Sequence, residues 1–160
     1  MTRPAHSSWI PAAFRPGSCW GLITAGGKAS PEYCGIAQVL RLNGFDVLEI
    51  DPRSLRRAGN PVYRHLTELP SIPHGLMIPA EIPNVEGWLE GSQILKIEQT
   101  WIWGEVSKEE DEISWLKQAK QGGQTLYLGG CPLKALECLK KIRHPFRHQL
   151  TQLRPWSLSA

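Results

Sequence analysis

Short apolar runs alternate with helix-like segments along most of this 160-residue chain, and this alternation constrains the fold more than any other feature. The runs are rich in Val, Ile, Leu, Tyr and Trp, and each ends at Gly, Pro or a polar residue, as strands do. The expected strands are residues 19–24, 45–50, 74–78, 99–103 and 124–130. We therefore predict an α/β fold: a single domain with a doubly wound parallel sheet of about five strands, covered by helices on both faces.

The segments between the runs carry helix signals. In residues 31–43, apolar side chains recur at helical spacing, Ser30 is placed to cap the helix, and Pro31 takes its first position. Gly44 then follows where a helix-ending glycine belongs. Ser107 stands three residues before Glu110, which is capping-box spacing. The other expected helices are a short one at 63–69, a weak one at 83–94, and amphipathic ones at 107–120 and 132–141.

The two ends of the chain differ in composition from the middle. Residues 1–18 are rich in Pro, Ser and Ala and contain no acidic residue, and residues 143–160 contain only basic charges. We expect a flexible leader over 1–18, the folded domain over 19–142 and a basic C-terminal extension over 143–160. The leader composition also suits an organelle transit peptide, so we expect a cytoplasmic protein, with an organelle matrix as the alternative.

Composition excludes several classes of protein. No apolar run approaches the ~18 residues of a membrane span, so we expect a soluble protein. The net charge of +3 does not favour nucleic-acid binding. The four cysteines form no C-x-x-C pair, which indicates reduced thiols and no metal site. His144 and His148 have a metal-ligand spacing, but Pro145 interrupts the helix that such a pair needs.

The stretch GLITAGGKASPEYCG, residues 21–35, is the strongest candidate for a ligand site. An apolar run that ends in glycines before a helix is typical of a phosphate-binding turn. The stretch does not match a P-loop, because Leu22 and Ala29 stand where that motif needs Gly and Ser or Thr. Nor does it match the dinucleotide pattern G-x-G-x-x-G, because Gly26 and Gly27 are adjacent.

Three segments of the chain together resemble the CoA-binding domain family of the Rossmann type. This family includes small stand-alone CoA-binding proteins and the N-terminal domain of the succinyl-CoA synthetase alpha subunit. The segments are NGFDVLEIDP (43–52), VYRHLTELPSIPHGLMIP (62–79) and TWIWGEVSKEEDEISWLKQAKQGGQTLYLGGCP (100–132). The resemblance extends over roughly residues 18–140, and it depends on the order and spacing of these segments.

The resemblance implies that the ADP end of CoA lies over the first turn, with Gly26, Gly27 and Ser30 near its phosphates. The physical chemistry agrees, since glycines admit close backbone approach and a helix N-terminus attracts anions. Lys28 would neutralise phosphate charge. Arg53, just past the second strand, would do so for the 3′-phosphate, which a planar guanidinium suits well.

Other strand ends would complete the site. Pro79 and Gly104 are expected on its far side, since ligands of doubly wound sheets bind beyond the carboxyl ends of the strands. The chain departs from the family where Thr24 replaces a glycine, Gly26 replaces a serine and Asp51 replaces an asparagine. An acid at the end of the second strand is also typical of the ribose-binding residue of NAD sites, so NAD is the alternative cofactor.

The sequence shows no paired carboxylates, activated nucleophile or metal cluster, and Cys131 has no predictable base beside it. We therefore expect a binding protein for CoA, an acyl-CoA or a related nucleotide that does not itself catalyse a reaction. One alternative is an interaction protein with a degenerate ligand site, joining a protein partner through its basic C-terminal extension. The other is an NAD-linked enzyme.

Overall fold

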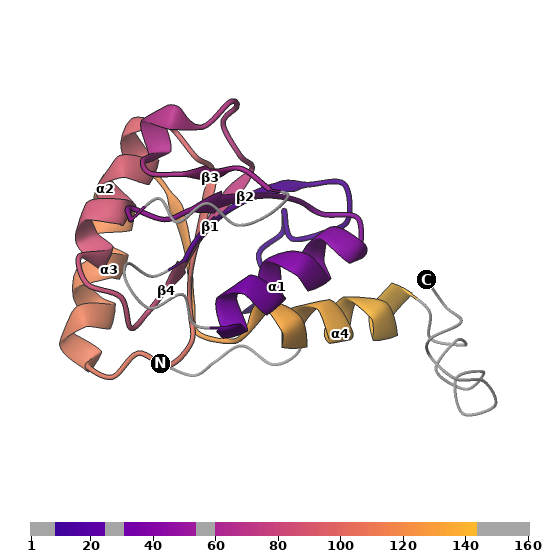
Figure 1. Ribbon diagram of the computed structural model, residues 1–160. Helices are drawn as coiled ribbons and strands as arrows, with labels where there is room; N and C mark the ends of the chain where they lie inside the picture. Colours follow the sequence, from indigo (N-terminus) through magenta and orange to yellow (C-terminus); the bar gives the residue numbers. More distant parts are fainter. Residues whose placement is uncertain (1–8, 25–30, 54–59, 144–160) are drawn as a thin grey trace.

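A computed structural model describes residues 9–24, 31–53 and 60–143 of the chain. Within these residues, six strands form one sheet in the order β3-β2-β1-β4-β5-β6, and all neighbouring strands are parallel (Figure 1). The strands are β1 (Cys19–Ile23), β2 (Asp46–Ile50), β3 (Val62–Tyr63), β4 (Gly75–Pro79), β5 (Gln99–Trp103) and β6 (Thr125–Leu128). The helices are α1 (Pro31–Leu42), α2 (Val85–Ile94), α3 (Glu109–Gln121) and α4 (Pro132–Arg143), and residues Leu66–Glu68 form the 3₁₀ turn η2. The predicted doubly wound α/β fold is confirmed.

The sheet separates two hydrophobic cores because successive side chains of a strand point to opposite faces. Leu22 and Met77 belong to the core beneath α1 and α4, whereas Ile23 and Ile78 belong to the core beneath α2 and α3. Figure 1 shows α1 beside α4 on one face and α2 beside α3 on the other. A parallel sheet buried on both faces explains why the strands read as continuous apolar runs.

The central pair of strands, β1 and β4, is held by a close contact between Trp20 and Gly75. Trp20 is fully buried, and a Cβ built on Gly75 would lie only 2.3 Å from two atoms of its indole ring. The same two residues are register partners in the β1–β4 ladder. Glycine is therefore required at position 75 so that the indole can lie across the neighbouring strand.

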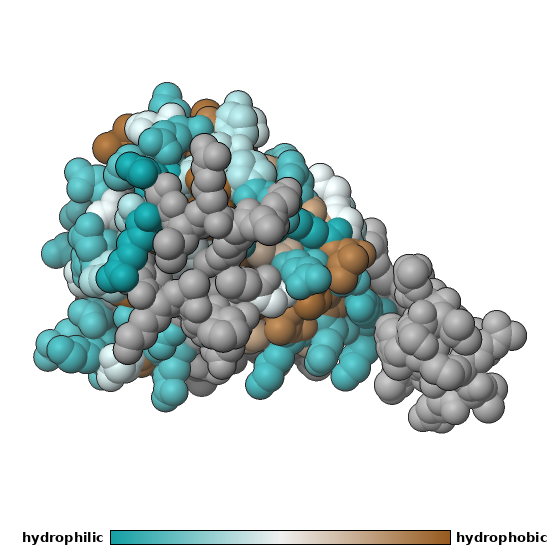
Figure 2. All heavy atoms as spheres, viewed as in Figure 1, coloured by the Kyte–Doolittle hydropathy of each residue, from teal (hydrophilic) through white to brown (hydrophobic). Residues whose placement is uncertain are grey.

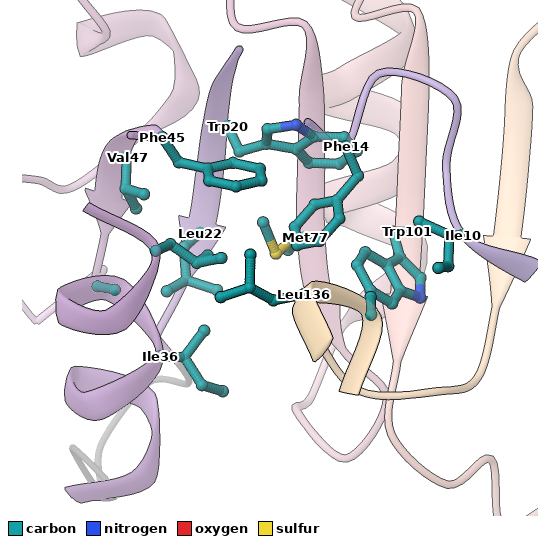
Figure 3. Close-up of a cluster of buried hydrophobic side chains, with 13 residues drawn as sticks. Ile10, Phe14, Trp20, Leu22, Ile36, Phe45, Val47, Met77, Trp101 and Leu136 are labelled. Carbon is teal, nitrogen blue, oxygen red and sulfur yellow. The ribbon is translucent and has the colours of Figure 1, made fainter. Parts of the chain in front are cut away.

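Residues 9–18 correct the expectation of a flexible leader over 1–18. Ile10 and Phe14 are buried in the core beneath α1 and α4, and Phe14 lies between the aromatic rings of that core (Figure 3). Its ring centroid is 4.7 Å from that of Phe45 and 5.3 Å from that of Trp101. Residues 1–8 lie outside the described part of the chain. The stretch from Trp9 onward is thus part of the folded domain, and the basic C-terminal extension remains a proposal.

Two local predictions were also imprecise. Where the sequence predicts a short helix over 63–69, the chain forms β3, which ends at Tyr63, and then η2. Two residues are too few for a strand to be recognised from its periodicity. The helix expected from Ser107 begins at Glu109 instead, after an N-cap at Lys108 whose side chain makes no capping hydrogen bond. Four acidic residues in the first turn of α3 stabilise that end through the helix dipole.

The ends of α1 match the sequence prediction. The helix begins at Pro31, and Gly44 follows it with a φ of +87°, in the left-handed region that favours glycine. Arg41 ties the helix to β2, since its guanidinium donates to the carbonyl of Val47 at 2.7 Å and lies 3.6 Å from the buried carboxylate of Glu49.

In the view of Figure 2, hydrophobic side chains gather over the region of α1 and α4.

Cys19 lies at the amino edge of the sheet, where β1 begins. Its backbone N–H donates to Nδ1 of His74 at 2.9 Å, and the N–H of His74 donates back to its carbonyl at 2.9 Å. Partial burial, then the negative charge of Asp46 and a hydrogen bond with it, raise the pKa of the Cys19 thiol from 9.0 to about 11. The folded protein therefore favours the protonated thiol.

Replacing Gly75 by alanine should lower the free energy of unfolding by about 1–3 kcal/mol, because the added methyl overpacks against the indole of Trp20. Gly35→Ala is the matched control, since the space around Gly35 in α1 is open and alanine favours a helix by about 0.5–1 kcal/mol. Urea unfolding of both variants measures the two changes. Equal stabilities would contradict the close contact.

The raised pKa of Cys19 predicts a loss of stability in alkali. The protonated thiol stabilises the folded state below pH 9.0, and this contribution disappears as the pH rises towards about 11. The difference in unfolding free energy between the wild type and Cys19→Ala should therefore shrink across that interval. Urea unfolding under reducing conditions at several pH values measures it, and parallel pH profiles would show that the pKa of the thiol is not raised.

Candidate functional site

The carboxyl edge of the sheet at β1 and β4 is the candidate site, because the strand order reverses there. From β1 the chain continues outward to β2 and β3, and it then returns to β4 on the other side of β1. The helices that follow β1 and β4 cover opposite faces of the sheet. Doubly wound sheets bind their ligands beyond the strand ends at such a switch point.

Hydrogen bonds connect the ends of β1, β2 and β3 directly to one another. Thr24 is fully buried and donates twice to the carbonyl of Ile50, from its backbone N–H at 2.9 Å and from its hydroxyl at 3.2 Å. On the other side, the N–H of Asp51 donates to the carbonyl of Tyr63 at 2.7 Å. The carboxyl end of β2 is thus held by hydrogen bonds to both of its neighbouring strands, β1 and β3.

Asp51 and Arg53 are brought together by a tight turn after β2. The side chain of Asp51 is buried, with 1% of the residue exposed, and its Oδ1 accepts the backbone N–H of Arg53 at 2.9 Å. Arg53 itself is exposed. The carboxylate therefore belongs to the interior of the turn, and the guanidinium belongs to its outer surface.

The ends of β4 and β5 form the far side of the site. Pro79 is the last residue of β4 and is buried, and the next residue, Ala80, donates its N–H to the carbonyl of Trp103 at 2.8 Å. Gly104 follows β5 with a φ of +93°, and its N–H donates to the carbonyl of Gly130 at 2.8 Å. Apart from its two chain neighbours, no described residue has an atom within 4 Å of a Cβ built on Gly104, so the backbone borders open space there.

Charge is distributed unevenly along this edge. On the β2 side, the exposed Arg53 follows the strand, whereas the exposed Glu81 and Glu105 follow β4 and β5. Pro79 and Trp103 are register partners, and each glutamate follows its strand by two residues. Among the described residues, the β2 side thus has an exposed cation, and the β4–β5 side has two exposed anions.

Some of the residues predicted for the ligand site lie outside the described part of the chain, and the structure places the others. Gly26, Gly27, Lys28 and Ser30 lie outside the described residues, so their roles stay predictions. The structure places Asp51 and Arg53 in one turn on the β2 side, and it places Pro79 and Gly104 at the ends of the adjacent strands β4 and β5.

Three residues that fix this edge were missed as such from the sequence. From the sequence, Thr24 is expected at the end of the first strand and Tyr63 in a short helix, and neither is expected to fix this edge. Gly130 was counted as the end of a strand, although two successive glycines after an apolar run are a signal for a turn with positive φ. Gly129 and Gly130 both have a φ of +81°.

The described residues also bear on three other features considered from the sequence: a metal site, a membrane span and Cys131. Within residues 9–24, 31–53 and 60–143, no three His, Cys, Asp or Glu side chains are grouped so that they could hold a metal ion. None of the described helices has the length and apolar character needed to cross a membrane. Cys131 is partly buried beside α4, and its carbonyl accepts the N–H of Ala135 at 2.9 Å. His144, His148 and most of the basic extension lie outside the described residues.

No protein-family model matches the chain, and no curated protein matches it by sequence. Solved structures do match its fold. A hypothetical protein from Pyrococcus horikoshii OT3 superposes with a TM-score of 0.67 at 17% identity, covering 86% of this chain and 96% of the other. A Thermus thermophilus protein reaches a TM-score of 0.61 at 18% identity, over 75% and 88% of the two chains.

A third structure belongs to a larger enzyme, the dinucleotide-forming acetyl-coenzyme A synthetase 1 of Ca. Korarchaeum cryptofilum, in complex with phosphate and ADP. It matches with a TM-score of 0.58 at 18% identity, over 69% of this chain and 25% of the synthetase. At these identities the likeness establishes the fold alone. The chain is thus a doubly wound, Rossmann-like α/β domain.

Proposed function

We propose that this protein binds CoA, an acyl-CoA or a related nucleotide at the carboxyl edge of its sheet, and that it acts as a binding protein. The observation that carries the proposal is the reversal of strand order between β1 and β4, with the exposed Arg53 beside it. A switch point supplies a location for a nucleotide, and a guanidinium supplies the charge that a phosphate requires.

The start of α1 supports the same location. The helix begins at Pro31, after β1 ends at Ile23, and it covers the sheet beside β1 and β2. Because α1 connects two parallel strands, its N-terminus lies at their carboxyl edge. The free N–H groups of a first helical turn and the positive end of the helix dipole favour an anion there.

The uneven charge supports one orientation of the ligand. The diphosphate and the 3′-phosphate of CoA would lie on the side of Arg53, away from Glu81 and Glu105. The pantetheine arm, which is uncharged, would then extend past Gly104, where the backbone borders open space. A synthetase that contains a domain with this fold was solved in complex with phosphate and ADP, which supports testing adenine nucleotides and CoA first.

Thermal-shift measurements with CoA, acetyl-CoA, NAD and ATP test the proposal. At a ligand concentration of about 100 times Kd, binding stabilises the folded state by about 2.7 kcal/mol. For a domain of this size that corresponds to a rise in Tm of roughly 5–10 °C. We expect CoA and acetyl-CoA to produce this rise. No rise with any of the four would contradict the proposal and favour an interaction protein, and a rise with NAD alone would favour an NAD-linked enzyme.

Paired substitutions test where the phosphates lie. Lys28→Ala combined with Arg53→Ala should weaken CoA binding by about 100- to 10,000-fold, because hydrogen bonds to charged groups contribute about 1.5–3 kcal/mol each. Removing the acetyl group from the ligand should change the affinity less. The matched control combines Arg15→Ala with Lys117→Ala, two exposed cations remote from the site. Unchanged affinity in the first double variant would show that the phosphate site lies elsewhere.

A further inference from the structure

The turn after β2 contains a buried acid and an exposed base two residues apart. Oδ1 of Asp51 accepts the N–H of Arg53 at 2.9 Å, while the Asp51 residue is 1% exposed and Arg53 is exposed. A buried carboxylate is costly unless hydrogen bonds satisfy it. The bond to Arg53 is therefore a structural requirement of the turn, and it fixes where the backbone of Arg53 lies.

The backbone that carries this turn is itself immobilised. The N–H of Asp51 donates to the carbonyl of Tyr63 in β3 at 2.7 Å. The carbonyl of Ile50, one residue earlier, accepts both donors of Thr24 at the end of β1. Because these bonds fix the backbone at Asp51, the hydrogen bond from the Asp51 side chain also fixes the position of the Arg53 backbone relative to the strand ends.

These contacts leave the carboxylate poorly placed to bind a ligand. A ribose-binding acid must present its oxygens to the ligand, whereas Asp51 is buried and one of its oxygens is engaged by the turn. Its hydrogen-bonding role also needs no negative charge, because the amide oxygen of an asparagine would accept the same N–H.

We propose that Asp51 is a positioning residue that holds Arg53 at the carboxyl edge and thereby sets how strongly the site prefers CoA over 3′-dephospho-CoA. This inference rests on the proposed function, because it assigns Arg53 to the 3′-phosphate. Preorganisation is the physical reason: an arginine whose backbone is fixed loses less conformational freedom on binding a phosphate than one on an unrestrained loop.

Calorimetric titration with CoA and 3′-dephospho-CoA tests the inference. The wild type should prefer CoA by roughly 10- to 100-fold, the range of one charged hydrogen-bonding contact. Arg53→Ala should remove this preference, and Asp51→Ala should reduce it at least about threefold. Asp51→Asn should keep the wild-type ratio, because it retains the acceptor for the N–H of Arg53. Asp51→Ala should have no further effect on the ratio when Arg53 is already alanine.

Ser92→Ala is the control for a general loss of stability. It removes a buried hydroxyl that bonds α2 to β5, away from this corner, and leaves the Asp51–Arg53 bond intact. It should lower Tm without changing the ratio of the two affinities. A ratio that stays at the wild-type value in Asp51→Ala would overturn the inference. An equal loss of the preference for CoA in Asp51→Asn and Asp51→Ala would also overturn it. So would a higher preference for CoA in Asp51→Asn, because it would indicate direct repulsion of phosphate by the carboxylate.

Amide hydrogen exchange at Arg53, followed by NMR without ligand, separates this inference from the proposed function. Exchange should be slow in the wild type and in Asp51→Asn, and at least about tenfold faster in Asp51→Ala. A wild type that binds neither coenzyme refutes the proposed function, and the exchange rates then decide alone whether Asp51 holds the turn. Equal exchange rates in all three proteins would overturn that role as well.

Discussion

The contact between the indole of Trp20 and the bare backbone of Gly75 is the constraint on which the centre of this fold depends. The two residues lie opposite each other in the ladder that joins β1 to β4, the pair across which the strand order reverses. Because position 75 has no side chain, a fully buried tryptophan fits over the neighbouring strand. Phe14 then packs against Trp20, with their ring centroids 5.9 Å apart, and Trp101 closes the cluster from β5.

This aromatic cluster explains why the domain needs the residues before β1. Phe14 and Ile10 fill the core beneath α1 and α4 (Figure 3). The indole N–H of Trp20 donates to the hydroxyl of Ser18 at 3.1 Å, so a buried polar group is satisfied within the same segment. Trp9 lies against Gly130, where a Cβ would approach its ring to 2.4 Å. Irregular chain therefore completes the cover on this face of the sheet.

The sequence reveals these features unequally, for physical reasons. Strands buried on both faces appear as apolar runs, and the ends of α1 are marked by Pro31 and Gly44, whose backbone preferences are intrinsic. The role of residues 9–18 depends on packing against strands far along the chain, which a proline-rich composition does not indicate. At the site, Arg53 could be located from the end of β2, but the direction of the Asp51 side chain could not, because an acid suits a turn and a ribose equally well.

Several backbone N–H groups at the carboxyl edge are already hydrogen-bonded within the protein, so they do not serve as donors to a phosphate. Three backbone N–H groups at strand ends donate to the neighbouring strand: those of Thr24, Asp51 and Ala80. The N–H of Gly104 donates to the turn after β6. The N–H of Arg53 is taken by Asp51. These strand-end amides therefore build the edge and do not recognise a ligand. In the proposed function, a phosphate is therefore bound by backbone N–H groups other than these, together with the side-chain charge of Arg53.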